Sequence, residues 1–437
     1  MNITDSASAT TEVDAPRPVA EHERIETIDV LRGIALFGVL MVNMAFFSFP
    51  LMLAVSDPSR ADWPMTEHFA FYFIKILFEY KFISLFSLLF GIGFAVQLMR
   101  ARERGTPFAG RFLRRLAILF CFGAIHAAAL WYGDILVFYA FSGLILLLCA
   151  GLSVRGLLIA SGAFLVCAIV FGTGFMLLQH VGGTMGAESI AASYEEGRQL
   201  VADGEAPTGF DAIMKAHFDP NNPIWLHAEQ IAYRDGPTGD AAAFRLVTYG
   251  FAIVINIVHQ GWHVLAMFML GAALMKARFF TPERADWHRR LVLIALPIGL
   301  VLEIAYTLLF TRGGLSAALA VPLHEVGSVL MMLGYVGGIT IIVQRGGLRP
   351  LFGPIAQAGR MALTVYLGST ILTTGVMYWW GLGWFGDVSR FGQIGVAIGV
   401  FTSLMLFSVL WLRFFRFGPL EWLWRSLTYL RPQPLLR

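Results

Sequence analysis

The sequence predicts an all-α integral membrane protein that crosses the bilayer about ten times. Of its 437 residues, 57% are hydrophobic and only 14% are charged, and its mean hydropathy is +0.68. A soluble domain contains about 25% charged residues, so this composition excludes an ordinary soluble protein. The apolar residues also fall into runs that are long enough to cross the hydrocarbon core as helices.

The N-terminal half is predicted to hold a tail and five membrane helices. Residues 1–23 are polar and low in hydrophobicity, so we expect a disordered cytoplasmic tail there. They lack the basic region followed by a hydrophobic core that marks a cleaved signal peptide. The membrane part, residues 24–180, begins with a span at about 28–50. The apolar stretch at residues 68–99 is too long for one straight span. Its length predicts an amphipathic or re-entrant piece followed by a membrane helix. Three further spans are predicted at about 112–131, 134–151 and 156–179.

The C-terminal half follows a hydrophilic interruption. Residues 181–245 are rich in Gly, Glu and Asp and could hold short helices. Residues 246–413 are predicted to hold five membrane helices, with a kink at Pro297. Residues 414–437 form a basic amphipathic tail with two Trp residues, Trp422 and Trp424, which suits a cytoplasmic helix at the membrane interface. The five spans are expected at about 246–275, 290–310, 322–344, 360–380 and 393–413.

The distribution of basic residues predicts the orientation. Loops near residues 100–115, 276–290 and 345–360 are rich in Arg and Lys, whereas loops near 51–67 and 181–245 are not. The positive-inside rule then makes both termini cytoplasmic and the hydrophilic segment extracytoplasmic. An even number of spans agrees with this orientation.

One stretch, residues 24–44 (RIETIDVLRGIALFGVLMVNM), combines charge with a hydrophobic run. Asp29 and Arg32 are three residues apart and share a helix face. Asn43 follows Arg32 by eleven residues on the same face, roughly 16 Å along the axis. Charge at the start of a span can serve as interfacial anchoring. Alternatively, the three side chains face inward and serve a site.

The same stretch resembles the opening of the bacterial YeiB family, whose later half is called domain of unknown function 418. The segments FISLFSLLFGIGF, RRLAILFCFGAIHAAALWYGDILVFYA, GRMALTVYLGST and FGPLEWLWRSLTY resemble other landmarks of that family. The resemblance therefore covers about residues 24–430. It implies a multi-pass protein of the bacterial cytoplasmic (inner) membrane.

The family is similar to the transmembrane acyltransferases in the D-x-x-R-G opening of this helix. That superfamily includes lysosomal heparan glucosaminide acetyltransferase and the bacterial acyltransferase family three. The resemblance implies transfer of an acyl group, commonly acetyl from cytoplasmic acetyl-CoA, to a sugar or envelope glycan across the membrane. Family-three enzymes carry a His where this chain has Asn43, so another residue must do its work here.

Acyl transfer from a thioester needs a general base, for which His126 is the best candidate. His126 lies about one turn below the outer end of the third span, and Asp134 begins the fourth span across a WYG turn. A His beside a carboxylate is oriented and made more basic. The alternative is that Asp134 caps its helix and His126 only packs by hydrogen bonding.

Donor binding needs positive charge to hold the phosphates of CoA. Asp29 and Arg32, together with Arg114 and Arg115 from the basic segment near residues 100–115, are the candidates, with acetyl-CoA as the expected donor substrate. Attraction of the same arginines to anionic lipid headgroups explains the cluster without a ligand.

A polar stripe marks the sixth span, because Asn256, His259 and His263 fall on one helix face. The stripe lines an acyl or substrate path, or it makes hydrogen bonds between helices. His259 and His263 have the spacing of a metal pair, but no third ligand is evident, so no metal is predicted. Further candidates for an acceptor or pathway site are Asn43, Glu303 within the seventh span, and Glu325, which with His324 opens the eighth.

Two functions from different classes remain open. One is a membrane acyltransferase. The alternative is a transporter or channel for a small polar or anionic solute, which would use the same polar residues as a pathway. The expected partners are membrane lipids and a small-molecule or glycan acceptor, with no nucleic acid. The small-residue helices and the Trp-rich tail are compatible with a homodimer.

Overall fold

The computed structural model describes residues 26–55, 63–346 and 348–437, so the expected tail, residues 1–23, lies outside the described residues. Within these ranges the regular elements are helices. Eight helical stretches of the described chain are long and apolar enough to cross a membrane. Two shorter apolar helices, Leu136–Leu148 and Ala362–Met377, coincide with the predicted fourth and ninth spans. The prediction of an all-helical, polytopic membrane protein is therefore confirmed.

The helices follow one another with short connections. The N-terminal part contains α1 (Glu26–Ser48), α2 (Leu51–Val55), α3 (Met65–Leu77), α4 (Lys81–Glu103), α5 (Ala109–Ala129), α6 (Leu136–Leu148) and α7 (Val154–Met185). The hydrophilic segment contains α8 (Ala187–Ala202), α9 (Gly209–Lys215) and α10 (Pro223–Arg234). The C-terminal part contains α11 (Thr238–Ile255), η2 (Asn256–Gln260), α12 (Gly261–Lys276), η3 (Pro282–Arg284), α13 (Ala285–Arg290), η4 (Leu291–Ala295), α14 (Leu296–Phe310), α15 (Gly314–Arg345), α16 (Arg349–Arg360), α17 (Ala362–Met377), α18 (Arg390–Phe414) and α19 (Pro419–Tyr429).

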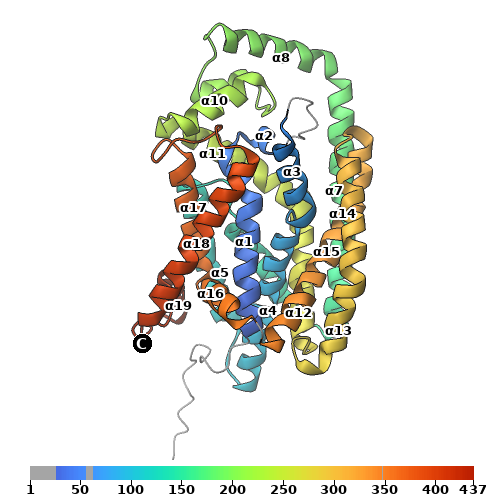
Figure 1. Cartoon of the computed structure of the whole chain (residues 1–437), viewed down its shortest axis with the longest axis vertical. Coiled ribbons are helices and arrows are strands. Elements are labelled where there is room, and N and C mark those ends of the chain that lie inside the picture. The colour runs from blue at the N-terminus through green and yellow to red at the C-terminus, as the bar shows by residue number, and fades with distance from the viewer. Residues whose placement is uncertain (1–25, 56–62, 347) are drawn as a thin grey trace, which may run out of the picture.

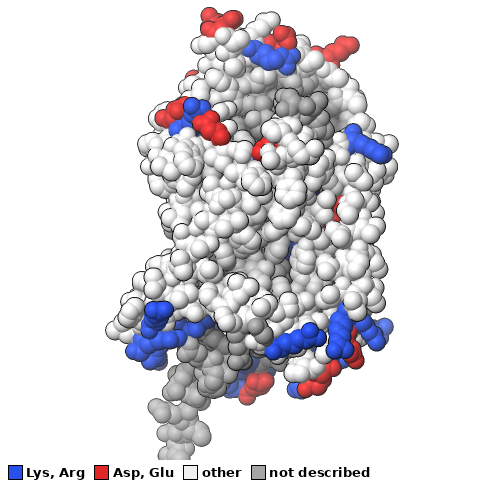
Figure 2. Space-filling model, in the orientation of Figure 1, with Lys and Arg blue, Asp and Glu red and all other residues white. Residues whose placement is uncertain are grey.

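The bundle has two chemically different ends. Helices α8 and α10 lie at one end, here called the α10 end, and α13, α16 and α19 lie at the opposite α19 end (Figure 1). Figure 2 shows that Lys and Arg outweigh Asp and Glu on the visible face at the α19 end, that both signs of charge occur at the α10 end, and that a nearly uncharged band lies between them. An uncharged band bounded by two charged rims is the surface that a bilayer requires.

Helix α1 runs through the middle of the bundle and packs against α4, α16, α17 and α18. Its contact with α16 depends on glycine: a Cβ at Gly33 would overlap the carbonyl oxygen of Ile355, and a Cβ at Gly359 would overlap that of Asp29. Helix α16 occupies a stretch that we expected to be a basic loop. This additional helix covers the start of α1 and places Arg360 next to the Asp29 and Arg32 turn.

Several helices are interrupted in the middle of the bundle. The expected break within residues 68–99 falls between α3 and α4, where Tyr80 adopts a φ of 63°. The π-helical turn η4 precedes Pro297, because proline lacks the N–H that a regular helix needs there. A second π turn, η2, joins α11 to α12.

Two predicted boundaries were wrong. Helix α11 begins at Thr238, inside the segment expected to be hydrophilic up to residue 245. Helix α15 begins at Gly314 and continues through Pro322, whereas we expected a start at 322. His324 and Glu325 therefore lie buried in the interior of α15 rather than at its opening, and neither caps a helix.

Candidate functional site

A cavity of about 410 Å³ lies at the α19 end, between the start of α1, the end of α4, the start of α5, and α19. Among the described residues, its lining includes more arginines than carboxylates. The arginines are Arg32, Arg100, Arg111, Arg115, Arg360 and Arg425, and the carboxylates are Asp29, Glu103 and Glu421. The excess of guanidinium groups makes the cavity suitable for a ligand that carries several negative charges.

The same cavity continues into the apolar interior of the bundle. On α5 it is lined by Arg111 and Arg115 in the first turns and by Leu119 further along. Its apolar walls include Phe90 from α4 and Tyr139 from α6. The residues therefore change from charged to apolar along its length, which suits a ligand with a charged head and an uncharged arm.

His126 lies beyond this apolar part and is 1% exposed. Its Nδ1 is 2.8 Å from Oδ2 of Asp134, and its Nε2 is 3.0 Å from Oγ1 of Thr370. The other oxygen of Asp134 accepts the backbone N–H of Val137 at 2.9 Å, in the first turn of α6. One carboxylate thus both starts α6 and fixes the orientation of the imidazole ring.

Tyr366 connects the cavity with His126. Its side chain lines the large cavity, and its ring centroid is 5.3 Å from that of His126. Tyr366 also lines a second, much smaller cavity, which Asn43 and Thr370 line as well. Tyr366 is therefore shared by the linings of the two cavities and by the ring contact with His126.

The predicted donor-binding residues separate into two groups. Asp29, Arg32 and Arg115 line the cavity; Arg32 pairs with Asp29 at 2.8 Å, and Arg115 stacks on Trp424 at 3.7 Å. Arg114 does not line it, because its Nη1 donates to the carbonyl oxygen of Thr428 on α19 at 2.9 Å.

The C-terminal helix contributes to the site in a way that sequence reasoning missed. We expected the amphipathic tail only to lie at the membrane interface, but α19 packs against α5 and α17 and brings Arg425 to the cavity. Glu421 fixes α19 in place, because its carboxylate accepts the backbone N–H groups of Leu363 and Thr364 at 2.6 and 3.0 Å. These N–H groups start α17 and would otherwise have no partner.

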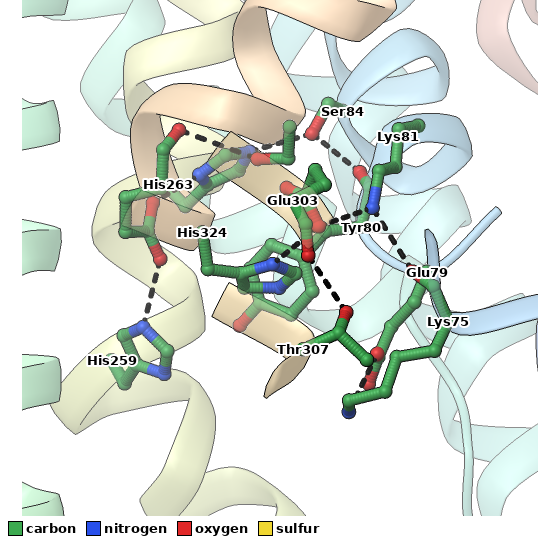
Figure 3. A network of polar contacts seen from close by, with 12 residues as sticks. Lys75, Glu79, Tyr80, Lys81, Ser84, His259, His263, Glu303, Thr307 and His324 are labelled. Atoms are coloured by element: carbon green, nitrogen blue, oxygen red, sulfur yellow. Dashed lines mark hydrogen bonds and ion pairs between the residues drawn. The ribbon is translucent and has the colours of Figure 1, made fainter. Parts of the chain in front are cut away.

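A second polar cluster lies in the middle of the bundle (Figure 3). Lys81 pairs with Glu303 at 2.6 Å, and His324 donates to the same oxygen of Glu303 at 3.1 Å. His259 and His263 contact the two oxygens of Glu325 at 2.8 and 2.6 Å. The buried ion network consists of Lys75, Glu79, Tyr80, Lys81, Ser84, His259, His263, Glu303, His324 and Glu325, and none of them lines the large cavity.

Comparison with known proteins gives the family. Residues 274–431 match the family described as "Protein of unknown function (DUF418)". The chain is 32% identical to the uncharacterized protein YxaH of Bacillus subtilis over 96% of this chain and 98% of that protein. The chain belongs to the DUF418 family. The DUF418 protein is also 29% identical to the uncharacterized YeiB of Escherichia coli, over 93% of this chain and 96% of the relative. This confirms the resemblance to the YeiB family. The descriptions of the family and of these two relatives name no activity.

The buried ion network of this DUF418 protein differs from the sequence-based prediction at two residues. Asn256 does not join it, since its Nδ2 donates to the carbonyl oxygen of Ala252 in its own helix at 2.8 Å. Lys81 was missed, although a lysine within an apolar run was a usable signal. We interpreted it as part of an amphipathic piece, whereas its side chain is 0% exposed.

Glu229, in the hydrophilic segment, is expected to make the stability of the protein depend on pH. Burial raises the pKa of Glu229, in α10, to about 7, while the N–H of Trp225, 2.9 Å from its Oε2, opposes that rise. Because the folded state binds this proton more tightly than the unfolded state, its contribution is fully present below about pH 4.5 and is lost as pH rises through about 7. We expect the free energy of unfolding to fall by about 3 kcal/mol across this window.

Thermal unfolding at several pH values checks this expectation. Glu229→Gln keeps the acceptor for Trp225 but removes the charge, so its stability should be higher than wild type at pH 8 and flatter with pH. The matched control is Glu196→Gln, because the side chain of Glu196 is 57% exposed. A pH dependence that is identical in wild type and Glu229→Gln would refute the role of this carboxyl.

Proposed function

We propose that this DUF418 protein is a membrane acyltransferase that moves an acyl group, acetyl in the first instance, from acyl-CoA to a sugar or envelope glycan. The large cavity carries the proposal, because its arginine-rich part and its apolar part lead to Tyr366 and His126. Arginine binds phosphate through paired, charge-assisted hydrogen bonds. The apolar walls suit the uncharged arm that links the CoA phosphates to its thioester.

His126 would act as the general base of the transfer. It takes the proton from the acceptor hydroxyl or amine, the acceptor atom attacks the thioester carbonyl carbon, and the C–S bond breaks to release the CoA thiolate. Asp134 holds the ring through Nδ1, which leaves Nε2 to exchange its contact with Thr370 for one with the acceptor. Asn43, which lines the smaller cavity together with Tyr366 and Thr370, would contact an acceptor that arrives from the far side.

The charge distribution supports the proposed orientation. Lys and Arg gather at the α19 end, where the cavity lies, and the positive-inside rule places such an end in the cytoplasm (Figure 2). The protein would then lie in the cytoplasmic membrane of a bacterial cell, and acyl-CoA would enter the cavity from the cytoplasm. The α10 end, with its hydrophilic helices, would face the acceptor.

Acetyl-CoA binding to the purified protein, measured by calorimetry in detergent, tests the proposal. We expect saturable binding that weakens about tenfold to 100-fold in Arg32→Ala, because a hydrogen bond to a charged group contributes about 1.5–3 kcal/mol. Arg413→Ala is the matched control, since Arg413 is exposed and does not line the cavity. Folded protein that fails to bind acetyl-CoA would remove the basis for an acyltransferase.

The buried ion network favours transport of a small polar or anionic solute as the second candidate function. Charged side chains in the middle of a bundle often mark a solute or proton path. A transporter would show counterflow of its solute in liposomes without any requirement for CoA.

A further inference from the structure

The buried ion network joins residues from six helices. They come from α3 and α4 and the break between them, from η2 and α12, and from α14 and α15. The side chains of Lys81, Glu303 and Glu325 are 0% exposed, and those of His263 and His324 are nearly so. Ionised groups at such depth are costly unless their charges balance and their protons have acceptors.

The hydrogen bonds around His263 determine how many protons its ring carries. Its Nδ1 faces a carboxylate oxygen of Glu325 at 2.6 Å, so Nδ1 donates. Its Nε2 is 2.6 Å from Oγ of Ser84, and that oxygen is also 2.5 Å from the carbonyl oxygen of Tyr80. A carbonyl only accepts, so the single hydroxyl proton of Ser84 goes to Tyr80. His263 Nε2 must then donate as well, which makes the ring an imidazolium.

A count of charges leads to the same result. Lys75 and Lys81 carry two positive charges, and Glu79, Glu303 and Glu325 carry three negative ones. One additional proton makes the network neutral, as its low-polarity surroundings require. His324 and His259 need only one ring proton each, since each ring makes one hydrogen bond to a carboxylate.

The histidines of the network differ in exposure and in their aromatic contacts. His259 is the more accessible partner of Glu325, with 13% of its side chain exposed, and its ring stacks near Tyr80 at 6.0 Å. Tyr306 of α14 stacks on His324 at 4.1 Å. Among the described residues, Oε1 of Glu303 has no hydrogen-bond partner, although it is buried.

We propose that Glu325, His259 and His263 form a proton-binding site inside the membrane-spanning bundle, with the stored proton held as the imidazolium of His263. His259, on the other oxygen of the same carboxylate, is where the site exchanges protons with its surroundings. Residues of α4 connect the site with the wall of the large cavity, because Ser84 contacts His263 at 2.6 Å. Ser84 and Ser87 are successive positions on one face of α4, and Ser87 contacts Tyr139 of the cavity wall at 2.6 Å.

Nitrogen-15 NMR of histidine-labelled protein in lipid nanodiscs tests the site directly, because the shifts distinguish an imidazolium from a neutral ring. At pH 8, where an ordinary histidine is neutral, we expect one histidine with protons on both nitrogens. This signal should be absent in His263→Gln and in Glu325→Gln. It should remain in His227→Gln, because His227 lies on α10 outside the network.

Two results in these spectra would overturn the proposal. A spectrum without an imidazolium at pH 8, or one whose imidazolium signal survives His263→Gln, would exclude the stored proton. If Glu325→Gln does not fold, Ser84→Ala provides the second variant. It keeps the carboxylate but removes the oxygen that accepts the Nε2 proton, so the imidazolium signal at pH 8 should be lost. An unchanged imidazolium signal at pH 8 in Ser84→Ala would also contradict it.

Discussion

Replacement of His126 by alanine is expected to lower the rate of acyl transfer by about 10²- to 10⁴-fold, the usual contribution of a general base. The ring lies beside Tyr366 at the end of the large cavity, and Asp134 holds it at 2.8 Å. Since His126 does not line the cavity, acetyl-CoA binding should stay close to that of wild type. A radioactive acetyl-transfer assay, run beside calorimetry, measures both quantities.

Two further variants separate a base from a residue that only packs. Asp134→Asn should lower the rate and shift its pH profile, because the amide still caps α6 but no longer stabilises a charged imidazole. His180→Ala, near the end of α7, is the matched histidine control and should transfer at the wild-type rate. Full turnover in His126→Ala would end its assignment as the base and direct attention to His259 and His263.

Replacement of Lys81 by methionine is expected to destabilise the protein by about 3–5 kcal/mol. The side chains of Lys81 and Glu303 are both 0% exposed, and their atoms are 2.6 Å apart. Methionine has a similar length but leaves the carboxylate of Glu303 without its cation, and an uncompensated buried charge is strongly unfavourable. Thermal unfolding followed by size-exclusion chromatography would show the loss as a lower midpoint.

The double variant Lys81→Met with Glu303→Leu tests whether the unpaired charge of Glu303 causes the loss of stability. It should recover much of the lost stability, because both members of the pair have been removed together. Lys215→Met is the control, since its pair with Glu196 is about half exposed and should contribute less than about 1 kcal/mol. Equal losses in the Lys81 and Lys215 variants would show that the buried pair has no special role.

The parts of the structure that the sequence predicted are those governed by local rules. Long apolar runs predicted the membrane helices, and the excess length of residues 68–99 predicted the break at Tyr80. The contact between His126 and Asp134 could be expected because only a short turn separates them. The pair of Asp29 and Arg32 follows in the same way from their helical spacing.

The remaining contacts depend on how distant helices pack. Lys81 and Glu303 are 222 residues apart, and no periodicity in either helix specifies such a partner. Amphipathicity shows which face of α19 is apolar, but it does not show whether that face meets lipid or protein. Arg425 was missed for this reason. The short, Gly- and Pro-containing α16 has no long apolar run that would distinguish it from a loop.

The attachment of α19 has a consequence for biosynthesis. The helix is synthesised after the membrane helices, yet it supplies Arg425 to the cavity and Glu421 to the start of α17. A nascent chain therefore cannot complete this pocket while it is being threaded into the membrane. A premature stop codon before α19 would yield an inserted protein whose pocket lacks one wall, so such an allele should behave as a null while still producing membrane-integrated polypeptide.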